Sequence, residues 1–341
     1  MVRAYTSVDS PLRTSKVTEE GKCATSEAAR NAAASVQKPA NENEARLRAS
    51  IEAEVVDGSP GVKFDDVAGL STAKQSLQEL VILPTLRADI FQGLRAPARG
   101  LLLFGPPGNG KTMLAKAVAT EANCTFFSIS ASSMTSKWVG EGEKLVRTLF
   151  KIALERAPSI IFIDEIDSLL SARKSDENEA SRRLKTEFLV QMDGVTSGDG
   201  QVIVIGATNR PDELDDAVIR RLVKRILIPL PDEDSRRALL QLALGKGNAK
   251  SGSMVKLSAR DLDAIVRATE GYSASDLRAL CSEAAMVPIR ELGSDISSVS
   301  ASQIRPIRLT DFQVALRSIR PSTNKEISET MEKWAENYGV R

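Results

Sequence analysis

Residues 100–112 read "GLLLFGPPGNGKT", and this stretch decides the fold. A short apolar run comes first, and residues 105–112 then match the pattern G-x-x-x-x-G-K-[ST] at the start of a helical stretch. In this context the glycines let backbone N–H groups turn inward around phosphate oxygens, and the helix N-terminus adds favourable partial charge. The stretch therefore predicts a nucleotide site in which Lys111 reaches the β- and γ-phosphates and Thr112 ligates Mg²⁺. The predicted ATP-binding residues are Gly105, Pro106, Pro107, Gly108, Asn109, Gly110, Lys111, Thr112 and Met113.

Four further apolar runs alternate with amphipathic helical stretches after this loop. They cover residues 125–130, 159–165, 202–209 and 225–230. Strands that alternate with helices predict a parallel α/β sheet. Because the runs are almost entirely apolar, we expect helices to cover both faces of that sheet.

After Pro231 the strand pattern stops and helical patterns follow. Two of them open with a Ser-x-x-Asp capping pattern, at residues 258–261 and 273–276. The last helical pattern carries an apolar stripe that ends in Trp334 and Tyr338, as expected of a helix that packs on a neighbouring surface. The predicted divisions are a disordered arm or linker over residues 1–45, a short helix and linker over 46–61, an α/β nucleotide-binding domain over 62–231, a small helical lid domain over 232–320 and a C-terminal helix over 321–341.

Two adjacent carboxylates, Asp164 and Glu165, end the apolar run "SIIFIDE". Such a pair is costly at the end of a buried strand unless it meets a cation, and ligands bind at the carboxyl edge of parallel sheets. We therefore predict that Asp164 holds Mg²⁺ and that Glu165 polarises an attacking water as general base. Asn209 ends the next run and is predicted to orient the same water. A surface carboxylate pair and an ordinary turn asparagine are the alternatives without a catalytic role.

Two features leave alternatives open. Arg220 and Arg221 precede the last strand, where they are either plain surface arginines or a finger for transition-state charge, which is worth about 10³–10⁵ in rate. Trp138 has polar neighbours and lies in a glycine-bounded loop, outside any apolar periodic run. This favours a side chain that grips an extended peptide over one that anchors the loop in the core.

Composition excludes several classes of function. The 341 residues include no His, which rules out His-based general bases, Ser-His-Asp triads and imidazole zinc sites. The formal net charge is +1, so the whole molecule has no strong preference for nucleic acid or anionic membrane. Three widely spaced cysteines indicate a reduced, cytosolic protein. No apolar run reaches the roughly 18–20 residues of a membrane span, and the N-terminus lacks the apolar core of a signal peptide.

The motifs "GPPGNGKT", "IIFIDEID", "GATNRPDELDDAVIRR" and "GYSASDL" together resemble the AAA ATPases of the meiotic clade, and within it the microtubule-severing enzymes. The similarity runs from about Val62 to the C-terminus. It implies a P-loop AAA+ fold with sheet order 5-1-4-3-2, in which the strand before Asn209 lies between the two phosphate-site strands. It also implies an ATP-promoted homohexamer with ATP between subunits, so that Arg220 and Arg221 reach the neighbour's nucleotide and the C-terminal helix supports ring assembly.

The resemblance also implies a substrate pore through the ring. A first pore loop would carry Lys137, Trp138 and Val139, and a second would carry Arg182 and Arg183. Their positive charge, repeated around a ring, suits an acidic, disordered client such as a tubulin tail. The implied protein is a cytoplasmic enzyme of the microtubule cytoskeleton that severs microtubules by pulling on tubulin tails. The alternatives are a katanin-like or ESCRT-III-directed remodeller with the same ATPase chemistry, and a nucleotide-binding scaffold without turnover.

Overall fold

The computed structural model describes residues 42–54, 56–57, 60–131, 134, 141–171, 179–197, 201–246, 255–293, 299–300 and 303–339. Its contacts divide the chain into two units, Met1–Glu42 and Asn43–Arg341, and the fold below is that of the second unit. Most of the predicted arm over residues 1–45 lies outside the described ranges. Its last four residues belong to a helix, because α2 begins at Glu42.

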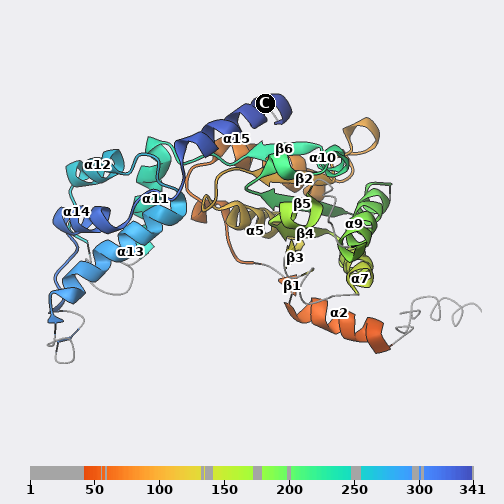
Figure 1. Ribbon diagram of the computed structural model, residues 1–341, viewed down its shortest axis with the longest axis horizontal. Coiled ribbons are helices and arrows are strands. Elements are labelled where there is room, and N and C mark those ends of the chain that lie inside the picture. The colour runs from red at the N-terminus through yellow and green to blue at the C-terminus, as the bar shows by residue number, and fades with distance from the viewer. Residues whose placement is uncertain are drawn as a thin grey trace, which may run out of the picture. The chain divides into compact units, whose positions relative to one another are not determined.

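A six-stranded sheet forms the centre of this unit (Figure 1). The strands are β1 Val56–Asp57, β2 Gly100–Phe104, β3 Thr125–Ser130, β4 Ser159–Asp164, β5 Val202–Thr208 and β6 Lys224–Leu227. They lie in the order β1-β3-β4-β5-β2-β6, in which β2 to β6 run parallel and β1 pairs antiparallel with β3. Counted over the parallel strands this is 5-1-4-3-2, so the predicted order is confirmed, with β5 between β4 and β2. The short edge strand β1 falls where a linker was expected.

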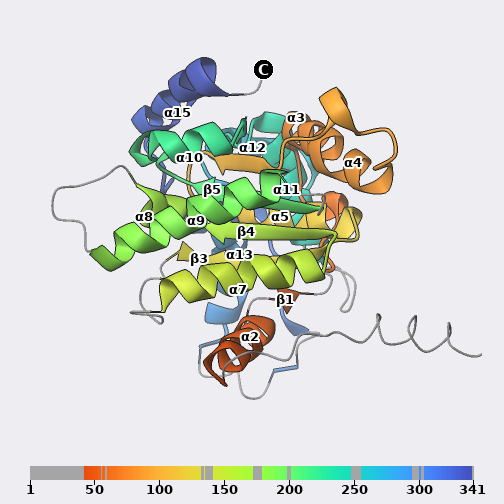
Figure 2. The ribbon, with the colours of Figure 1, turned by 90° about the vertical axis from the view of Figure 1, so that its right-hand side faces the viewer.

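Helices cover both faces of the sheet, and Figure 2 shows α7 and α9 lying across one of them. The helices are α2 Glu42–Glu54, α3 Ser71–Leu77, α4 Leu83–Leu86, α5 Lys111–Glu121, α7 Gly142–Glu155, α8 Ile166–Leu170, α9 Glu179–Ser197, α10 Asp216–Arg221, α11 Glu233–Lys246, α12 Ala259–Ala268, α13 Ala274–Arg290, α14 Leu309–Ser318 and α15 Lys325–Tyr338. Among these described helices, none combines the length and the apolar character needed to cross a membrane.

The central strands β2, β4 and β5 are buried on both faces, as their apolar sequences predict. In β2, Leu102 and Phe104 belong to one core cluster, whereas Leu101 and Leu103 belong to another. The first cluster also contains the buried sides of α7 and α9, and the second contains those of α3 and α5. Because side chains alternate along a strand, each face of the sheet has a core of its own.

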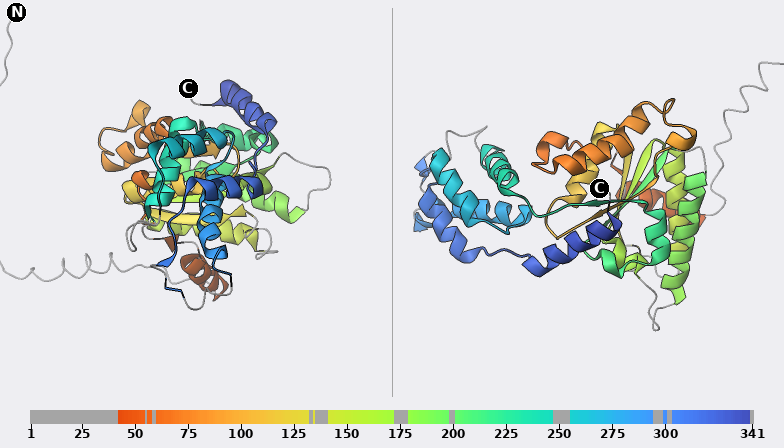
Figure 3. Two further views of the ribbon diagram at one scale, coloured as in Figure 1. Left: turned by 90° about the vertical axis from the view of Figure 1, so that its left-hand side faces the viewer. Right: turned by 90° about the horizontal axis from the view of Figure 1, so that it is seen from above.

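Helices α11 to α14 form a separate group around a third core cluster, which includes Phe312 (Figure 3). Both predicted capping boxes are confirmed. Ser258 Oγ accepts the backbone N–H of Asp261, and Ser273 Oγ accepts that of Asp276, each at 3.2 Å. These caps start α12 and α13 at the residues that the sequence pattern indicated.

The C-terminal helix α15 packs by the middle of its apolar stripe. Met331 is buried, and the ring of Trp334 meets Phe104 edge-on, with centroids 4.6 Å apart. Ile327 and Tyr338, toward the two ends of the helix, remain largely exposed. The stripe therefore attaches α15 to the end of β2, immediately before the P-loop.

Candidate nucleotide-binding site

The predicted P-loop joins the carboxyl end of β2 to α5. Gly110 has a φ of +82°, and α5 begins directly after it at Lys111. Gly105 has a φ of +146°, and a Cβ at this position would lie 2.1 Å from the carbonyl oxygen of Ile228. Glycine is therefore required where the loop passes the end of β6.

Lys111 is a buried cation at the base of the loop. Its Nζ donates to the carbonyl oxygens of Gly105 at 2.9 Å and Pro106 at 3.0 Å, and to Oδ1 of Asn209 at 2.6 Å. Burial lowers the pKa of Lys111 to about 8, against the opposing effect of nearby carboxylates such as Asp164. Because its three hydrogen-bond acceptors are all uncharged, Lys111 can still gain from an anionic phosphate.

The side chains predicted to hold Mg²⁺ lie together. Thr112 Oγ1 donates to Asp164 Oδ2 at 2.8 Å, which joins the start of α5 to the end of β4. A hydroxyl and a carboxylate are hard oxygen ligands, and Mg²⁺ is usually held by one or two carboxylates with water and substrate phosphates. Within the described ranges no cluster of three or more His, Cys, Asp or Glu side chains is placed to hold a metal. The pair therefore fits a Mg²⁺ ion that arrives with a nucleotide.

Glu165 has an unusual backbone conformation. Its φ is +52°, a left-handed value that costs a residue other than glycine roughly 1–2 kcal/mol. The backbone N–H of Glu165 donates to Asp164 Oδ1 at 3.0 Å, and Glu165 is also the N-terminal cap residue of α8. Its side chain is exposed and lines the cavity described below. Residues in such strained conformations concentrate at functional sites, and no sequence pattern revealed this one.

Asn209 is positioned by neighbours that the sequence analysis did not identify. Thr208 Oγ1 donates to Asp167 Oδ1 at 2.6 Å and accepts the backbone N–H of Arg210 at 2.9 Å. These two bonds bracket Asn209 while its own Oδ1 accepts from Lys111. The third acidic residue of "IDEID", Asp167, was the available signal in the sequence, but its contact with Thr208 depends on the adjacency of β4 and β5.

A cavity of about 1300 Å³ connects these groups. Residues 107–113, Asp164, Glu165 and Asn209 line it, whereas Gly105 and Pro106 lie buried outside the lining and support Lys111. The remaining walls contain no motif of ligating residues, so the sequence did not predict them. These walls comprise residues 66–73, Ser76, parts of the segment 226–243, and Ala274, Ser275, Leu277 and Arg278.

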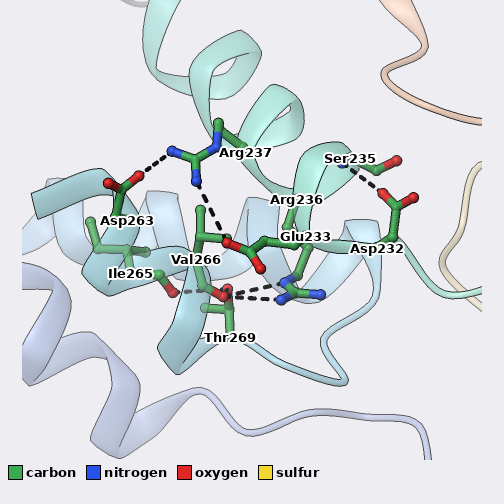
Figure 4. A network of polar contacts seen from close by, with 9 residues as sticks. All are labelled: Asp232, Glu233, Ser235, Arg236, Arg237, Asp263, Ile265, Val266 and Thr269. Atoms are coloured by element: carbon green, nitrogen blue, oxygen red, sulfur yellow. Dashed lines mark hydrogen bonds and ion pairs between the residues drawn. The ribbon is translucent and has the colours of Figure 1, made fainter. Parts of the chain in front are cut away.

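One of these missed walls is held by a polar network at the start of α11 (Figure 4). Asp232, which lines the cavity, accepts the backbone N–H of Ser235 at 2.8 Å, and its bonds from Ser235 lower its pKa. Arg236 donates to the carbonyl oxygens of Pro231 at 3.1 Å and Val266 at 3.2 Å. The network thus ties the turn between β6 and α11 to α12, and fixes the position of this wall.

The two candidate finger residues lie away from the cavity of their own chain. Arg220 is exposed, and neither arginine lines the cavity. Arg221 forms a bidentate pair with Asp193 of α9, with nitrogen–oxygen distances of 2.7 and 2.5 Å, and also donates to the carbonyl oxygen of Ala217 at 2.9 Å. Neither arginine is therefore placed to contact a nucleotide bound in this cavity.

The predicted pore residues are only partly described. Lys137, Trp138 and Val139 lie outside the described residues. Arg182 and Arg183 are exposed in the first turns of α9, where Arg183 pairs with Glu179. The latter two positions are thus helical and open to solvent.

Comparisons with known proteins agree with this geometry. Residues 101–230 match the "ATPase family associated with various cellular activities (AAA)", and residues 260–304 match the "AAA+ lid domain". Spastin from Gallus gallus is 57% identical over 288 residues, and spastin from Homo sapiens is 58% identical over the same length. Each alignment covers 84% of this chain but only 46% of the spastin, so the chain spans less than half of these relatives.

Solved structures extend the agreement to the fold. The AAA domain of FIGL-1 in complex with ADP aligns over 89% of this chain and 100% of its own, with a TM-score of 0.81 and 46% identity. A katanin structure, solved in work on katanin self-assembly, aligns over 88% of this chain and 98% of its own, with a TM-score of 0.71 and 35% identity. With its P-loop, its 5-1-4-3-2 sheet and its helical lid, the chain belongs to the AAA ATPases, a family of nucleotide-binding, ATP-hydrolysing enzymes.

Proposed function

We propose that this chain is the ATPase part of a microtubule-severing enzyme, which assembles as an ATP-promoted homohexamer and pulls acidic tubulin tails through its pore. The observation that carries the ATPase assignment is the pair of contacts from the P-loop to the neighbouring strands. Thr112 meets Asp164 at 2.8 Å and Lys111 meets Asn209 at 2.6 Å. The client is proposed from the similarity to spastins over 84% of the chain, and the microtubule cytoskeleton is proposed as its location on the same ground.

The division into domains is part of this proposal. Residues 62–231 would form the ATPase domain, 232–320 the lid and 321–341 the C-terminal helix that supports the ring. The separate core clusters of the sheet and of helices α11 to α14 support the first boundary.

Each residue at the carboxyl edge of the sheet has one task in the proposed reaction. The backbone of residues 107–113 and the Lys111 ammonium would bind the phosphates, while Gly105 and Pro106 hold Lys111 in place. Thr112 and Asp164 would hold Mg²⁺, which when bound neutralises phosphate charge. Glu165 accepts the proton of the attacking water as the water oxygen bonds the γ-phosphorus, and Asn209 orients that water. The bond from the γ-phosphorus to the bridging oxygen breaks, and the products are ADP and inorganic phosphate.

The ring supplies the remaining groups. Arg220 and Arg221 would reach the nucleotide of the neighbouring subunit and stabilise the charge of the transition state. Their position at the end of α10, outside the lining of the cavity of their own chain, and the exposure of Arg220 support this role. The proposed client-gripping residues are Lys137, Trp138, Val139, Arg182 and Arg183.

Fluorescent, stabilised microtubules imaged with the protein and ATP test the proposal. We expect filaments to shorten and break, and we expect no severing of microtubules whose acidic tails have been removed by protease. Glu165→Gln should bind ATP but lower turnover at least about 100-fold, in the range expected for a lost general base, and should abolish severing. Glu270→Gln removes an exposed carboxylate outside the cavity and serves as the control.

The outcomes separate the alternatives. Intact microtubules under active ATP turnover would point to a remodeller with a different client, katanin-like or ESCRT-III-directed. ATP binding without turnover by the wild-type protein would point to a scaffold. Near-normal turnover by Glu165→Gln would refute the assignment of the base.

A further inference from the structure

The first turn of α13 is docked on the P-loop. The first four N–H groups of a helix have no partner within the helix, so they need acceptors from elsewhere. In α13 the capping box at Ser273 satisfies one of them. The N–H of Ala274 donates to Asn109 Oδ1 at 3.3 Å, and that of Ser275 donates to the carbonyl oxygen of Gly108 at 3.0 Å. Two residues of the phosphate loop therefore complete the cap of a lid helix.

The contact between loop and helix is close. Gly108 has a φ of +77°, and a Cβ there would lie 2.9 Å from the Cβ of Ser275 and 3.0 Å from the Oγ of Ser273. Asn109 is 5% exposed, and its Nδ2 donates to the carbonyl oxygen of Pro106 at 3.4 Å. The Asn109 amide thus bonds the loop to itself through its nitrogen and to α13 through its oxygen.

Helix α12 provides a comparison within the same chain. It begins with an identical Ser-x-x-Asp box, at Ser258 and Asp261, and neither residue lines the nucleotide cavity. A capping box of this kind therefore does not require contact with the P-loop. The docking of α13 is an additional feature, and it occurs at the helix whose first residues form a wall of the cavity.

We infer that Asn109 is a positioning residue that holds α13 against the P-loop and thereby keeps the cavity closed over bound nucleotide. This inference rests on the proposed nucleotide site. The loop can bind two partners at once. Its backbone N–H groups can donate to phosphates. Asn109 Oδ1 and the Gly108 carbonyl oxygen accept hydrogen bonds from the first backbone N–H groups of α13. Withdrawal of α13 opens the wall formed by residues 274–278 and breaks these bonds. Asn109 therefore slows nucleotide release.

The docked turn also connects to the C-terminal helix. Asp276 Oδ2 accepts the backbone N–H of Ser322 at 3.1 Å and its Oγ at 3.0 Å, three residues before α15 begins. Tyr272 donates its hydroxyl to the carbonyl oxygen of Ile319 at 2.8 Å. A displacement of α13 at the P-loop therefore also displaces the segment that leads into α15.

The test compares Asn109→Ala with Ser258→Ala, which removes the matching cap at α12. Release of a fluorescent ADP analogue is followed by stopped flow, and exchange of the Ala274 and Ser275 amides is followed without nucleotide and with ADP. We expect Asn109→Ala to speed release roughly 3- to 10-fold, the range for loss of one hydrogen bond, and to speed exchange of both amides. Ser258→Ala should leave the release rate of the ADP analogue and the exchange rates of both amides as in the wild type.

A third variant separates positioning from a general loss of structure. Asn109→Asp keeps an oxygen acceptor for the Ala274 N–H, so protection of that amide in the nucleotide-free protein should return. Wild-type release and exchange in Asn109→Ala would overturn the inference. If the wild-type protein binds no ADP, the proposed nucleotide site fails and the closing role fails with it, whereas normal binding with unchanged release refutes the role of Asn109 alone.

Discussion

Replacement of Lys111 by Met should remove a pH-dependent contribution to the stability of the nucleotide-free protein and should also destroy the phosphate site. Burial lowers the pKa of Lys111 from 10.5 to about 8. The protonated side chain is therefore less stable in the folded protein than in the unfolded chain, where water solvates it. This difference in pKa between the two states lowers the free energy of unfolding by about 3 kcal/mol at pH 7. Methionine leaves the three acceptors of Lys111 without this donor, at about 1 kcal/mol for each hydrogen bond, which offsets most of the gain. We therefore expect the free energy of unfolding at pH 7 to change by less than about 1 kcal/mol.

The pH dependence has a defined sign. Between pH 8 and 10.5 the unfolded chain keeps a proton on Lys111 that the folded protein has released, so the free energy of unfolding rises with pH. Lys111 should contribute a rise of about 1.4 kcal/mol from pH 7 to pH 9. Two buried thiols oppose it above about pH 9, because burial raises the pKa of Cys124 to about 11 and of Cys281 to about 12. The unfolded chain then loses thiol protons that the folded protein keeps.

The free energy of unfolding is measured with urea at pH 7, 8 and 9 for the wild type and for Lys111→Met. The difference between the two proteins at each pH gives the contribution of Lys111. Lys144→Met, at an exposed position of α7, is the control and should show the wild-type pH profile. Saturating ADP should flatten the rise in the wild type, because phosphate charge favours protonated Lys111. A wild-type-minus-variant difference that stays constant from pH 7 to 9, or a Lys111→Met protein markedly less stable than wild type at pH 7, would refute the reasoning.

Two further predictions concern the support of the site. Thr208→Val removes the hydroxyl that donates to Asp167, and should lower the free energy of unfolding by about 1–2 kcal/mol. It should also lower ATP turnover, because the end of β5 loses a restraint. Urea unfolding and steady-state ATPase assays on the same sample check both effects. Trp334→Ala removes the ring that packs on Phe104, and should cost about 2 kcal/mol, less than for a fully buried Trp. Hydrogen exchange should then accelerate across α15 and stay unchanged in α12.

Much of the site was predictable because its parts are encoded locally. The P-loop pattern, the apolar strand and its two terminal carboxylates each occupy a few consecutive residues, and parallel strands bring their carboxyl ends to one edge. The contact between Lys111 and Asn209 joins residues 98 apart, yet it follows from the strand order. By contrast, the bond from Thr208 to Asp167 and the left-handed φ of Glu165 depend on neighbours and backbone geometry that residue types alone do not specify.

The two arginines of α10 have different surroundings that the local sequence does not predict. Consecutive residues of a helix point about 100° apart, so adjacent arginines necessarily have different surroundings. Arg220 is exposed, whereas the bidentate pair with Asp193 raises the pKa of Arg221 and lowers that of Asp193. The Asp193 side chain is 55% exposed, and exposed ion pairs contribute only about 0–1 kcal/mol. In the proposed ring, the triphosphate of a neighbouring subunit would carry more charge than one carboxylate and would displace Asp193 from Arg221. The pair is therefore compatible with the proposed role of both arginines as fingers, because the contact that holds Arg221 against α9 is a weak one.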